Sequence, residues 1–207
     1  AGASVMGAFI WIRGPRVRLR CTDGHVHRVY GGNLMGHCPQ IGRAGAKMTD
    51  FAIYEVAVGG GVIALSPMPG GDGDFGRDLL SVIAWRPDLV VTLVEQAELD
   101  AEGAADLDAS LAQAGVDWRH LPMVDFGTPS VNDDPDWDDV IGNVVVRLSA
   151  GDRILVHCRG GCGRSGMAVL RVMIAAGEDA DAALLRLRTV RPCAIETDAQ
   201  MQWARTA

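Results

Sequence analysis

The sequence predicts an α/β fold in which a central, mostly parallel sheet is flanked by helices. Three observations support this prediction. Short apolar runs bounded by Gly, Pro or Asp recur between residues 53 and 157, and their length and β-branching are typical of buried strands. Segments with helical periodicity lie between these runs, and such alternation favours a parallel sheet covered by helices. A third observation is that the last apolar run leads into a glycine-rich loop that opens a helix.

The predicted elements follow one another along residues 53–204. The apolar runs predict five strands, at Ile53–Val58, Val62–Ser66, Leu89–Val94, Trp118–Met123 and Ile154–His157. Helical periodicity and end signals predict helices at Arg77–Trp85, Leu107–Ala114 closed by Gly115, and Trp137–Leu148 behind Asp136 as N-cap. Three more helices are expected at 165–177, 179–190 and 197–204.

Composition and charge limit the function classes. A chain of 207 residues with 48% hydrophobic and 22% charged residues is typical of one globular domain. The net charge of -7 argues against nucleic acid as a partner. The apolar run Val5–Ile12 is too short to span a membrane, so we expect no membrane association. Five scattered cysteines suggest free thiols in a reducing compartment, and hence the cytoplasm.

The character of the chain changes near Met48. Residues 1–47 hold seven basic residues and one acidic residue, whereas residues 48–207 hold 12 basic and 25 acidic residues. The first part has no sustained apolar period. We therefore predict a basic, poorly ordered N-terminal arm at 1–47, with a targeting segment as the alternative, and a functional domain at 48–207.

The stretch "HCRGGCGRSG" at 157–166 combines a thiol, a glycine-rich loop and fixed positive charge. A loop between a strand and a helix leaves backbone N–H groups free to bind an anion. Helix N-termini and neighbouring cations favour the nucleophilic thiolate, and Cys158 has both. The planar guanidinium of Arg164 can hold two phosphate oxygens, and Ser165 can donate a hydrogen bond to the leaving thiolate. The pattern predicts nucleophilic attack by Cys158 on phosphorus.

The rest of the loop forms the expected phosphate cradle. Its glycines let backbone amides approach the anion and permit left-handed dihedrals. We expect the substrate phosphate to contact the loop residues Arg159, Gly160, Gly161, Cys162 and Gly163. The plainer alternative is a buried, inert thiol beside a turn.

The pattern His157-Cys158-x-x-Gly161-x-x-Arg164-Ser165 resembles the signature of cysteine-based protein tyrosine phosphatases, in the dual-specificity branch. The segments "ALSPMPG", "HLPMVDFGTPS" and "RPCAIET" extend this resemblance over about residues 59–205. It implies a mostly parallel sheet flanked by helices, and no metal. The expected substrate is a phosphoprotein, with phosphotyrosine preferred and phosphoserine or phosphothreonine as further possibilities, and no cofactor is expected.

The resemblance also implies a general acid at Asp125, 33 residues before Cys158. Asp125 follows a predicted strand on a segment with Gly127 and Pro129, where a carboxyl could protonate the leaving group and later activate water. A turn-initiating aspartate is the alternative. The rival carboxylates are interpreted as a solvated charge run that caps the next helix, and they are Asp133, Asp134, Asp136, Asp138 and Asp139.

Three further residues lie in or near the predicted site, one with a supporting role and two whose roles the sequence leaves open. His157, at the end of a buried strand, is expected to order the loop and to help stabilise the thiolate. Gln200 matches a glutamine near the attacking water in related enzymes, but it also completes a capping box with Thr197. Cys162 departs from the family pattern and is either a neutral filler or a redox partner of Cys158.

Parts of the sequence also suggest other functions. A metal-binding protein is suggested by a group of arm residues, although their spacing matches no familiar zinc pattern: Cys21, His25, His27, His37 and Cys38. A non-catalytic phosphate-binding module is a second rival, but both thiol and acid are present. A nucleotide-binding P-loop is discarded because its lysine is missing. Sulfurtransferase or arsenate reductase activity fits the downstream segment less well.

Overall fold

The computed structural model describes residues 19–22, 25–28, 36–37, 51–129 and 137–206. The chain divides into two units, Ala1–Met48 and Thr49–Ala207. The predicted helix cap Asp136 and the carboxylates Asp133 and Asp134 lie outside the described residues.

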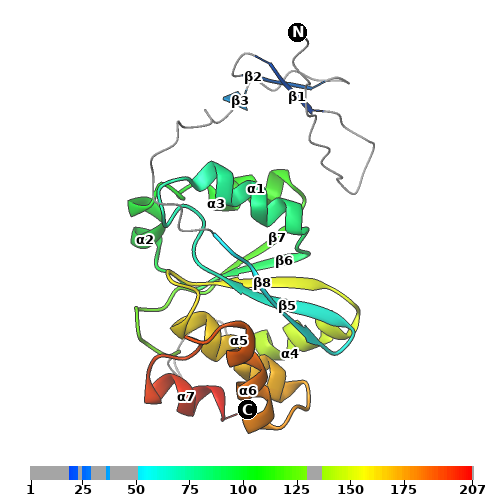
Figure 1. The fold of residues 1–207 in the computed structure, drawn as a ribbon, viewed down its shortest axis with the longest axis vertical. Helices are drawn as coiled ribbons and strands as arrows, with labels where there is room; N and C mark the ends of the chain where they lie inside the picture. Colours follow the sequence, from blue (N-terminus) through cyan, green and yellow to red (C-terminus); the bar gives the residue numbers. More distant parts are fainter. Residues whose placement is uncertain (1–18, 23–24, 29–35, 38–50, 130–136, 207) are drawn as a thin grey trace. The chain divides into compact units, whose positions relative to one another are not determined.

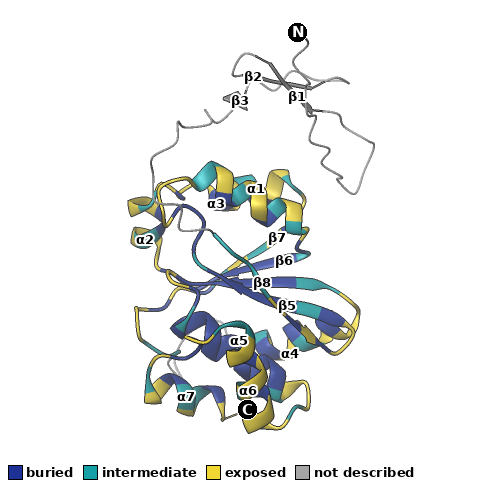
Figure 2. Ribbon diagram, viewed as in Figure 1, coloured by how far each residue is buried: buried dark blue, intermediate teal, exposed yellow. Residues whose placement is uncertain are grey.

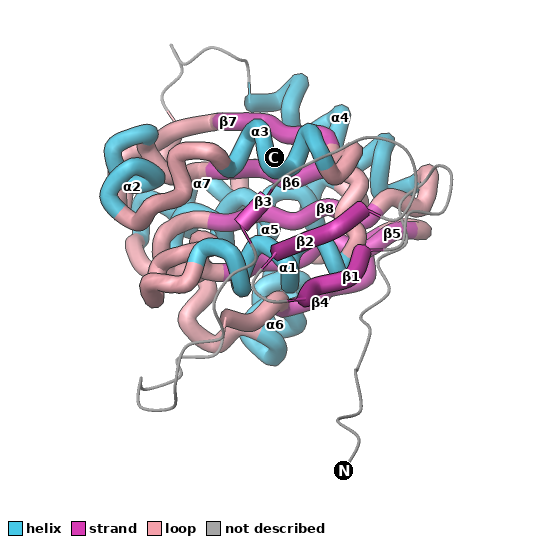
Figure 3. Tube along the Cα trace, turned by 90° about the horizontal axis from the view of Figure 1, so that it is seen from above, coloured by secondary structure: helices cyan, strands magenta, loops and turns pink. Residues whose placement is uncertain are grey.

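The second unit contains a five-stranded sheet with the order β4-β5-β8-β6-β7 (Figures 1 and 3). Its strands are β4 Tyr54–Val58, β5 Gly61–Ser66, β6 Leu89–Thr92, β7 Asp117–His120 and β8 Arg153–His157. Strand β4 runs antiparallel to β5, and the other neighbours are parallel. The predicted mostly parallel sheet is confirmed, with a two-residue turn and positive φ at Gly59 explaining the one antiparallel pair.

Helices cover both faces of the sheet (Figure 1). On one side lie α1 Phe75–Trp85, α2 Gln96–Ala101 and α3 Leu107–Gln113. On the other lie α4 Trp137–Ser149, α5 Gly163–Ala175, α6 Ala180–Val190 and α7 Asp198–Ala204. Short polar side chains begin several of them: Asp74 accepts a hydrogen bond from the amide of Arg77, and Asp179 from that of Ala182.

Buried residues are concentrated in β6, β8 and α5 (Figure 2). All four residues of β6 and four of the five in β8 are buried, as expected for central parallel strands covered on both faces. The first eleven residues of α5 are buried as well. The loop between β8 and α5 is therefore anchored at both ends in buried elements of the unit.

Two elements depart most from the prediction, while β6 ends two residues earlier than predicted, at Thr92, and α1 begins two residues earlier, at Phe75. Helix α2 was not predicted, because its six residues carry no apolar period; it begins with a capping box between Glu95 and Glu98. Strand β7 ends at His120 rather than at Met123, and alternate residues are exposed because it is the sheet edge. Beyond His120 the chain still follows β6, with Leu121 donating to the carbonyl of Thr92.

The first unit contains an antiparallel sheet of β1 Leu19–Thr22, β2 His25–Arg28 and β3 Gly36–His37. No strand was predicted in this part of the chain. The missed signal is Asp23-Gly24, a dipeptide typical of hairpins. Cys38, one of the metal-ligand candidates, lies outside the described residues, and no cluster of three or more His, Cys, Asp or Glu suited to a metal occurs among those described.

In the described part of the chain, no helix combines the length and apolarity that crossing a bilayer requires.

Candidate active site

The loop predicted to hold phosphate connects β8 to α5, with Cys162 at the helix N-cap. Gly161 has φ +65°, and a Cβ at this position would come within 2.5 Å of the carbonyl carbon of Ser66. Only glycine tolerates both the dihedral and the contact. The amide of Met68 donates to the carbonyl of Arg159 at 3.2 Å, so the end of β5 supports the loop from outside.

Cys158 is a free thiol with 3% of its surface exposed. Its Sγ lies 3.3 Å from the Oγ of Ser165, a fully buried residue in the first turn of α5. The helix N-terminus beside the sulfur favours negative charge there. The structure thus brings Cys158 and Ser165 together as the loop pattern predicts.

Arg164 has only 1% of its surface exposed, and acidic groups hold its guanidinium. Nη1 donates to Glu98 Oε2 at 2.7 Å and to the carbonyl of Met123 at 3.0 Å, and Nη2 donates to Glu98 Oε1 at 2.9 Å. Burial disfavours the charged form, but hydrogen bonds to Glu98 and the charges of Cys158 and Glu98 outweigh it, so the pKa of Arg164 is raised. Its Nε is buried without a partner.

Glu98 was missed by the sequence analysis. The hydrogen bond from Arg164 is the largest cause of its lowered pKa, against the opposing effect of burial. The same carboxylate accepts from the amide of Glu95 at 3.0 Å, which ties the arginine's partner to the start of α2. The only sequence signal was the capping-box spacing Glu95-x-x-Glu98, which indicates a helix start and not a site.

Asp125 lies beside the loop on the segment after β7. Its Oδ1 forms an ion pair with Nη2 of Arg164 at 3.1 Å, while its side chain is 50% exposed. The next residue, Phe126, has φ +57° and is exposed, as is Val124. Among the rivals, Asp138 sits on α4 and pairs with Arg171, and Asp139 occupies the same first turn.

His157 is completely buried at the end of β8. Its Nε2 lies 2.7 Å from Thr92 Oγ1, which also accepts a hydrogen bond from Trp118 Nε1 at 2.8 Å. Burial, with smaller effects from the charges of His120 and Arg164, lowers the pKa of His157 to about 3. A neutral imidazole that anchors the end of β8 agrees with a supporting position and not with a proton-transfer role near neutral pH.

Because His157 is buried in its neutral form, the free energy of unfolding should fall measurably in acid. Its pKa of about 3 in the folded protein lies below the 6.5 of an ordinary histidine. Between these two pH values only the unfolded chain binds the proton. The contribution of neutral His157 to the free energy of unfolding is therefore fully present above pH 6.5 and is lost as the pH falls towards 3. The His157→Asn variant should lack this slope, at most about 1.4 kcal/mol per pH unit. Urea unfolding of both proteins at several pH values measures the difference; parallel curves would contradict it.

Gln200 contacts both the loop and the acid segment. Its Nε2 donates to the carbonyl of Gly127 at 3.2 Å, and a Cβ at Gly163 would come within 2.9 Å of its Oε1. Thr197 caps α7 by accepting from the Gln200 amide at 3.2 Å. The reciprocal half of the predicted capping box is shifted, because Gln200 Oε1 accepts from the amide of Glu196 and not from that of Thr197. The residue therefore serves the helix cap and lies at the site.

The expectation of free thiols is wrong at Cys162, which forms a disulfide with Cys193. Cys162 is thus not paired with Cys158, because the loop directs its side chain towards the segment between α6 and α7. The argument for a reducing compartment loses its basis, since it counted these thiols as free. Arg159, which is largely exposed, pairs with Glu102 at 3.1 Å. A Cβ added at Gly160 would meet no atom of the described structure within 4 Å.

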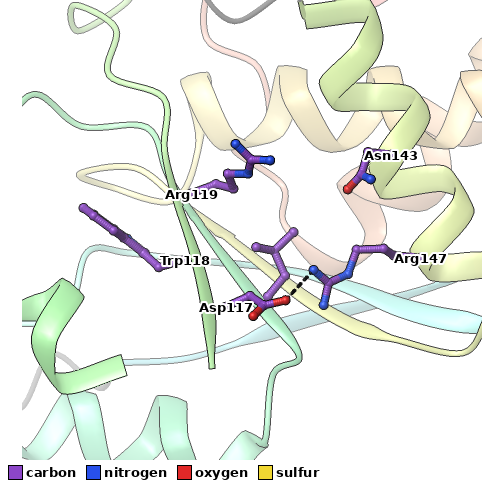
Figure 4. Close-up of a pocket in the computed structure, with 6 residues that line it drawn as sticks. Asp117, Trp118, Arg119, Asn143 and Arg147 are labelled. Atoms are coloured by element: carbon purple, nitrogen blue, oxygen red, sulfur yellow. Dashed lines mark hydrogen bonds and ion pairs between the residues drawn. The ribbon is translucent and has the colours of Figure 1, made fainter. Parts of the chain in front are cut away.

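A separate hollow lies between β7 and α4 (Figure 4). Arg119 extends from the strand towards the helix, and Arg147 bonds Asp117 at 2.8 Å and Asp152 at 2.7 Å. None of the residues predicted for the active site lines this hollow. Its lining residues are Leu89, Asp117, Trp118, Arg119, Asn143 and Arg147.

Comparisons with known proteins identify the family of the chain. A family model described as "Polymorphic toxin system, DSP-PTPase phosphatase" matches residues 87–178. The solved structure of Tk-PTP in its active form is 34% identical, with a TM-score of 0.56, over 68% of this chain and 87% of that chain. The chain belongs to the dual-specificity family of cysteine-based protein phosphatases.

Two other structures share the phosphatase fold at lower identity. Kinase-associated phosphatase is 20% identical with a TM-score of 0.68, over 77% of this chain and 94% of that chain. PTPMT1 in complex with PI(5)P is 16% identical with a TM-score of 0.57, over 73% and 92% respectively. No curated protein matches the sequence significantly.

Proposed function

We propose that this phosphatase hydrolyses phosphotyrosine in proteins through a phosphocysteine intermediate on Cys158. The observation that carries the proposal is the convergence of three groups: the Cys158 sulfur beside Ser165, the buried Arg164, and Asp125 paired with that arginine. Nucleophile, phosphate-binding fork and exposed carboxyl are the parts that such a displacement needs.

In the first step the Cys158 sulfur attacks phosphorus, the ester P–O bond breaks, and Asp125 protonates the departing oxygen. In the second step Asp125, now a carboxylate, takes a proton from water as that water attacks phosphorus and the P–S bond breaks. Ser165 stabilises the returning thiolate, and inorganic phosphate leaves. Arg164 and the loop amides balance the charge of the phosphoryl oxygens in both steps.

Two features favour a phosphotyrosine peptide over a phosphoinositide. Exposed apolar side chains of Val124 and Phe126 flank Asp125, where an aromatic leaving group could pack. The loop's one exposed cation, Arg159, is already paired with Glu102, which leaves little basic charge for a polyanionic headgroup. The binding of PI(5)P is stated for PTPMT1, a relative of low identity.

A phosphopeptide panel run beside phosphoinositides tests this substrate assignment. Higher kcat/KM for phosphotyrosine than for phosphoserine and phosphothreonine peptides, with slower phosphoinositide turnover, is the expected order. Preferred turnover of a phosphoinositide would overturn it. Binding of phosphate without turnover of any substrate would favour the non-catalytic alternative.

Replacing Asp125 by asparagine should slow hydrolysis of a phosphotyrosine peptide by roughly 10²–10³-fold, because the leaving oxygen loses its proton donor. The loss should shrink for an aryl phosphate whose leaving group is a weaker base and needs less protonation. Steady-state kinetics with both substrates measure this. An equal loss for the two would remove Asp125 from the general-acid role.

A second candidate concerns the role of the whole protein, as the catalytic effector of a polymorphic toxin system. The family model matched by residues 87–178 carries this description, and the Cys162–Cys193 disulfide is a bond that persists in oxidising surroundings outside the cytoplasm. Induced production of the full chain in bacterial cells should arrest growth, whereas the Cys158→Ser variant should not. Equal growth of both cultures would reject this candidate.

A further inference from the structure

Residues 191–195, between α6 and α7, hold three consecutive carbonyl groups of the phosphate loop. Arg191 donates through Nη2 to the carbonyl of Gly160 at 2.6 Å and through Nε to that of Gly161 at 3.0 Å. The amide of Ile195 donates to the carbonyl of Cys162 at 3.2 Å. Cys193 adds a covalent link to Cys162 through the disulfide.

These contacts fix the direction of the loop amides. In a trans peptide the N–H points opposite to the preceding C=O across the same plane. Turning the carbonyls of Gly160, Gly161 and Cys162 towards residues 191–195 therefore turns the amides of the next residues, at 161 to 163, to the opposite side. Those amides belong to the cradle proposed to bind the phosphoryl oxygens.

Three sets of contacts hold the segment itself in place. The Arg191 guanidinium stacks on the ring of Tyr54, 4.4 Å from its centroid. Arg188 donates to the carbonyls of Ala194 at 3.1 Å and Ile195 at 3.4 Å. Gly166 packs so closely against this segment that a Cβ there would lie 2.8 Å from the Ile195 amide nitrogen. The support of the loop is thus a packed part of the fold.

We propose that residues 191–195 form a brace that keeps the phosphate loop in its oxyanion-binding shape, with Arg191 as its principal positioning residue and the Cys162–Cys193 disulfide as a second tie. The inference rests on the proposed function of the loop and assigns no contact between Arg191 and substrate. Lysine cannot replace Arg191, because one ammonium on a flexible stem does not reproduce two donors in a fixed planar fork.

The test compares Arg191→Ala, Arg191→Lys and the double variant Cys162→Ser/Cys193→Ser with wild type. Each is assayed for inorganic phosphate affinity, kcat/KM for an aryl phosphate, and the pH dependence of Cys158 alkylation. The control is Arg186→Lys. Arg186 also donates to a backbone carbonyl, but this carbonyl belongs to Ala57 of β4 and not to the phosphate loop. Peptide mapping without reductant verifies the disulfide in the wild type.

Both arginine variants should weaken phosphate binding and lower kcat/KM about tenfold, the size of one lost charge-assisted hydrogen bond, and lysine should not restore either value. The double serine variant should show a smaller loss in the same direction, and the alkylation profile should shift to higher pH in all three. The control should keep wild-type values. Wild-type phosphate affinity and kcat/KM in Arg191→Lys would overturn the brace. A wild type that neither binds phosphate nor turns over substrate would instead overturn the proposed function.

Discussion

Replacing Cys158 by serine is expected to lower the turnover of an aryl phosphate by roughly 10⁴-fold or more. The hydroxyl is a far weaker nucleophile than a thiolate, and no other thiol is available in the loop because Cys162 is held in the disulfide with Cys193. The fold should survive, since serine is smaller than cysteine and can hydrogen-bond Ser165. Steady-state kinetics and thermal unfolding of the two proteins measure both effects.

Phosphate binding by the same variant separates chemistry from binding. The loop amides and Arg164 remain, so inorganic phosphate should bind Cys158→Ser at least as well as wild type. Turnover that persists near the wild-type rate in a folded Cys158→Ser protein would remove the nucleophile from the account.

The second large effect is expected for Arg164→Lys, with a loss of roughly 10²–10³-fold in kcat/KM. The arginine's two terminal nitrogens bind both oxygens of Glu98, and one of them also binds the carbonyl of Met123. Lysine keeps the charge but cannot make this set of contacts or hold two phosphate oxygens in a plane. Leaving Glu98 without its partner adds to the cost, because that carboxylate is mostly buried.

The control for this variant is again Arg186→Lys, which replaces an arginine of α6 that binds Glu178 and lies outside the site. Its kcat/KM should stay close to wild type. If Arg164→Lys also kept wild-type kcat/KM, a charge alone would be sufficient and the fork geometry would have no role.

Local sequence patterns predicted most of the fold and the centre of the site. The strand that ends at His157, the glycine loop and the helix that follows are consecutive in the chain, so their relation to one another is set by local geometry. Strands β5 and β6 could also be predicted locally, because each is a short, mostly apolar run that ends in one small polar residue, Ser66 or Thr92. Asp125 could be proposed because a resemblance supplied its role.

Residues that act across long separations could not be predicted. Glu98 bonds Arg164 across 66 positions of sequence, and it stands on a helix of six residues, which is too short to show an apolar period. The partner of Cys162 lies 31 residues away, and an odd cysteine count gave no pairing. Among the interactions described, the side chain of Arg191 contacts only loop carbonyls and a tyrosine ring, and contacts to backbone carbonyls do not depend on the residue type that supplies them.

The measurement that tests the central claim most directly is capture of the covalent intermediate. Wild-type protein is mixed rapidly with a phosphotyrosine peptide, quenched during the first turnover, digested, and mapped by mass spectrometry for a phosphoryl group. The account predicts this group on Cys158, absent from the Cys158→Ser protein. Turnover at the wild-type rate with no phosphoryl group on Cys158, or with the group on another residue, would contradict it.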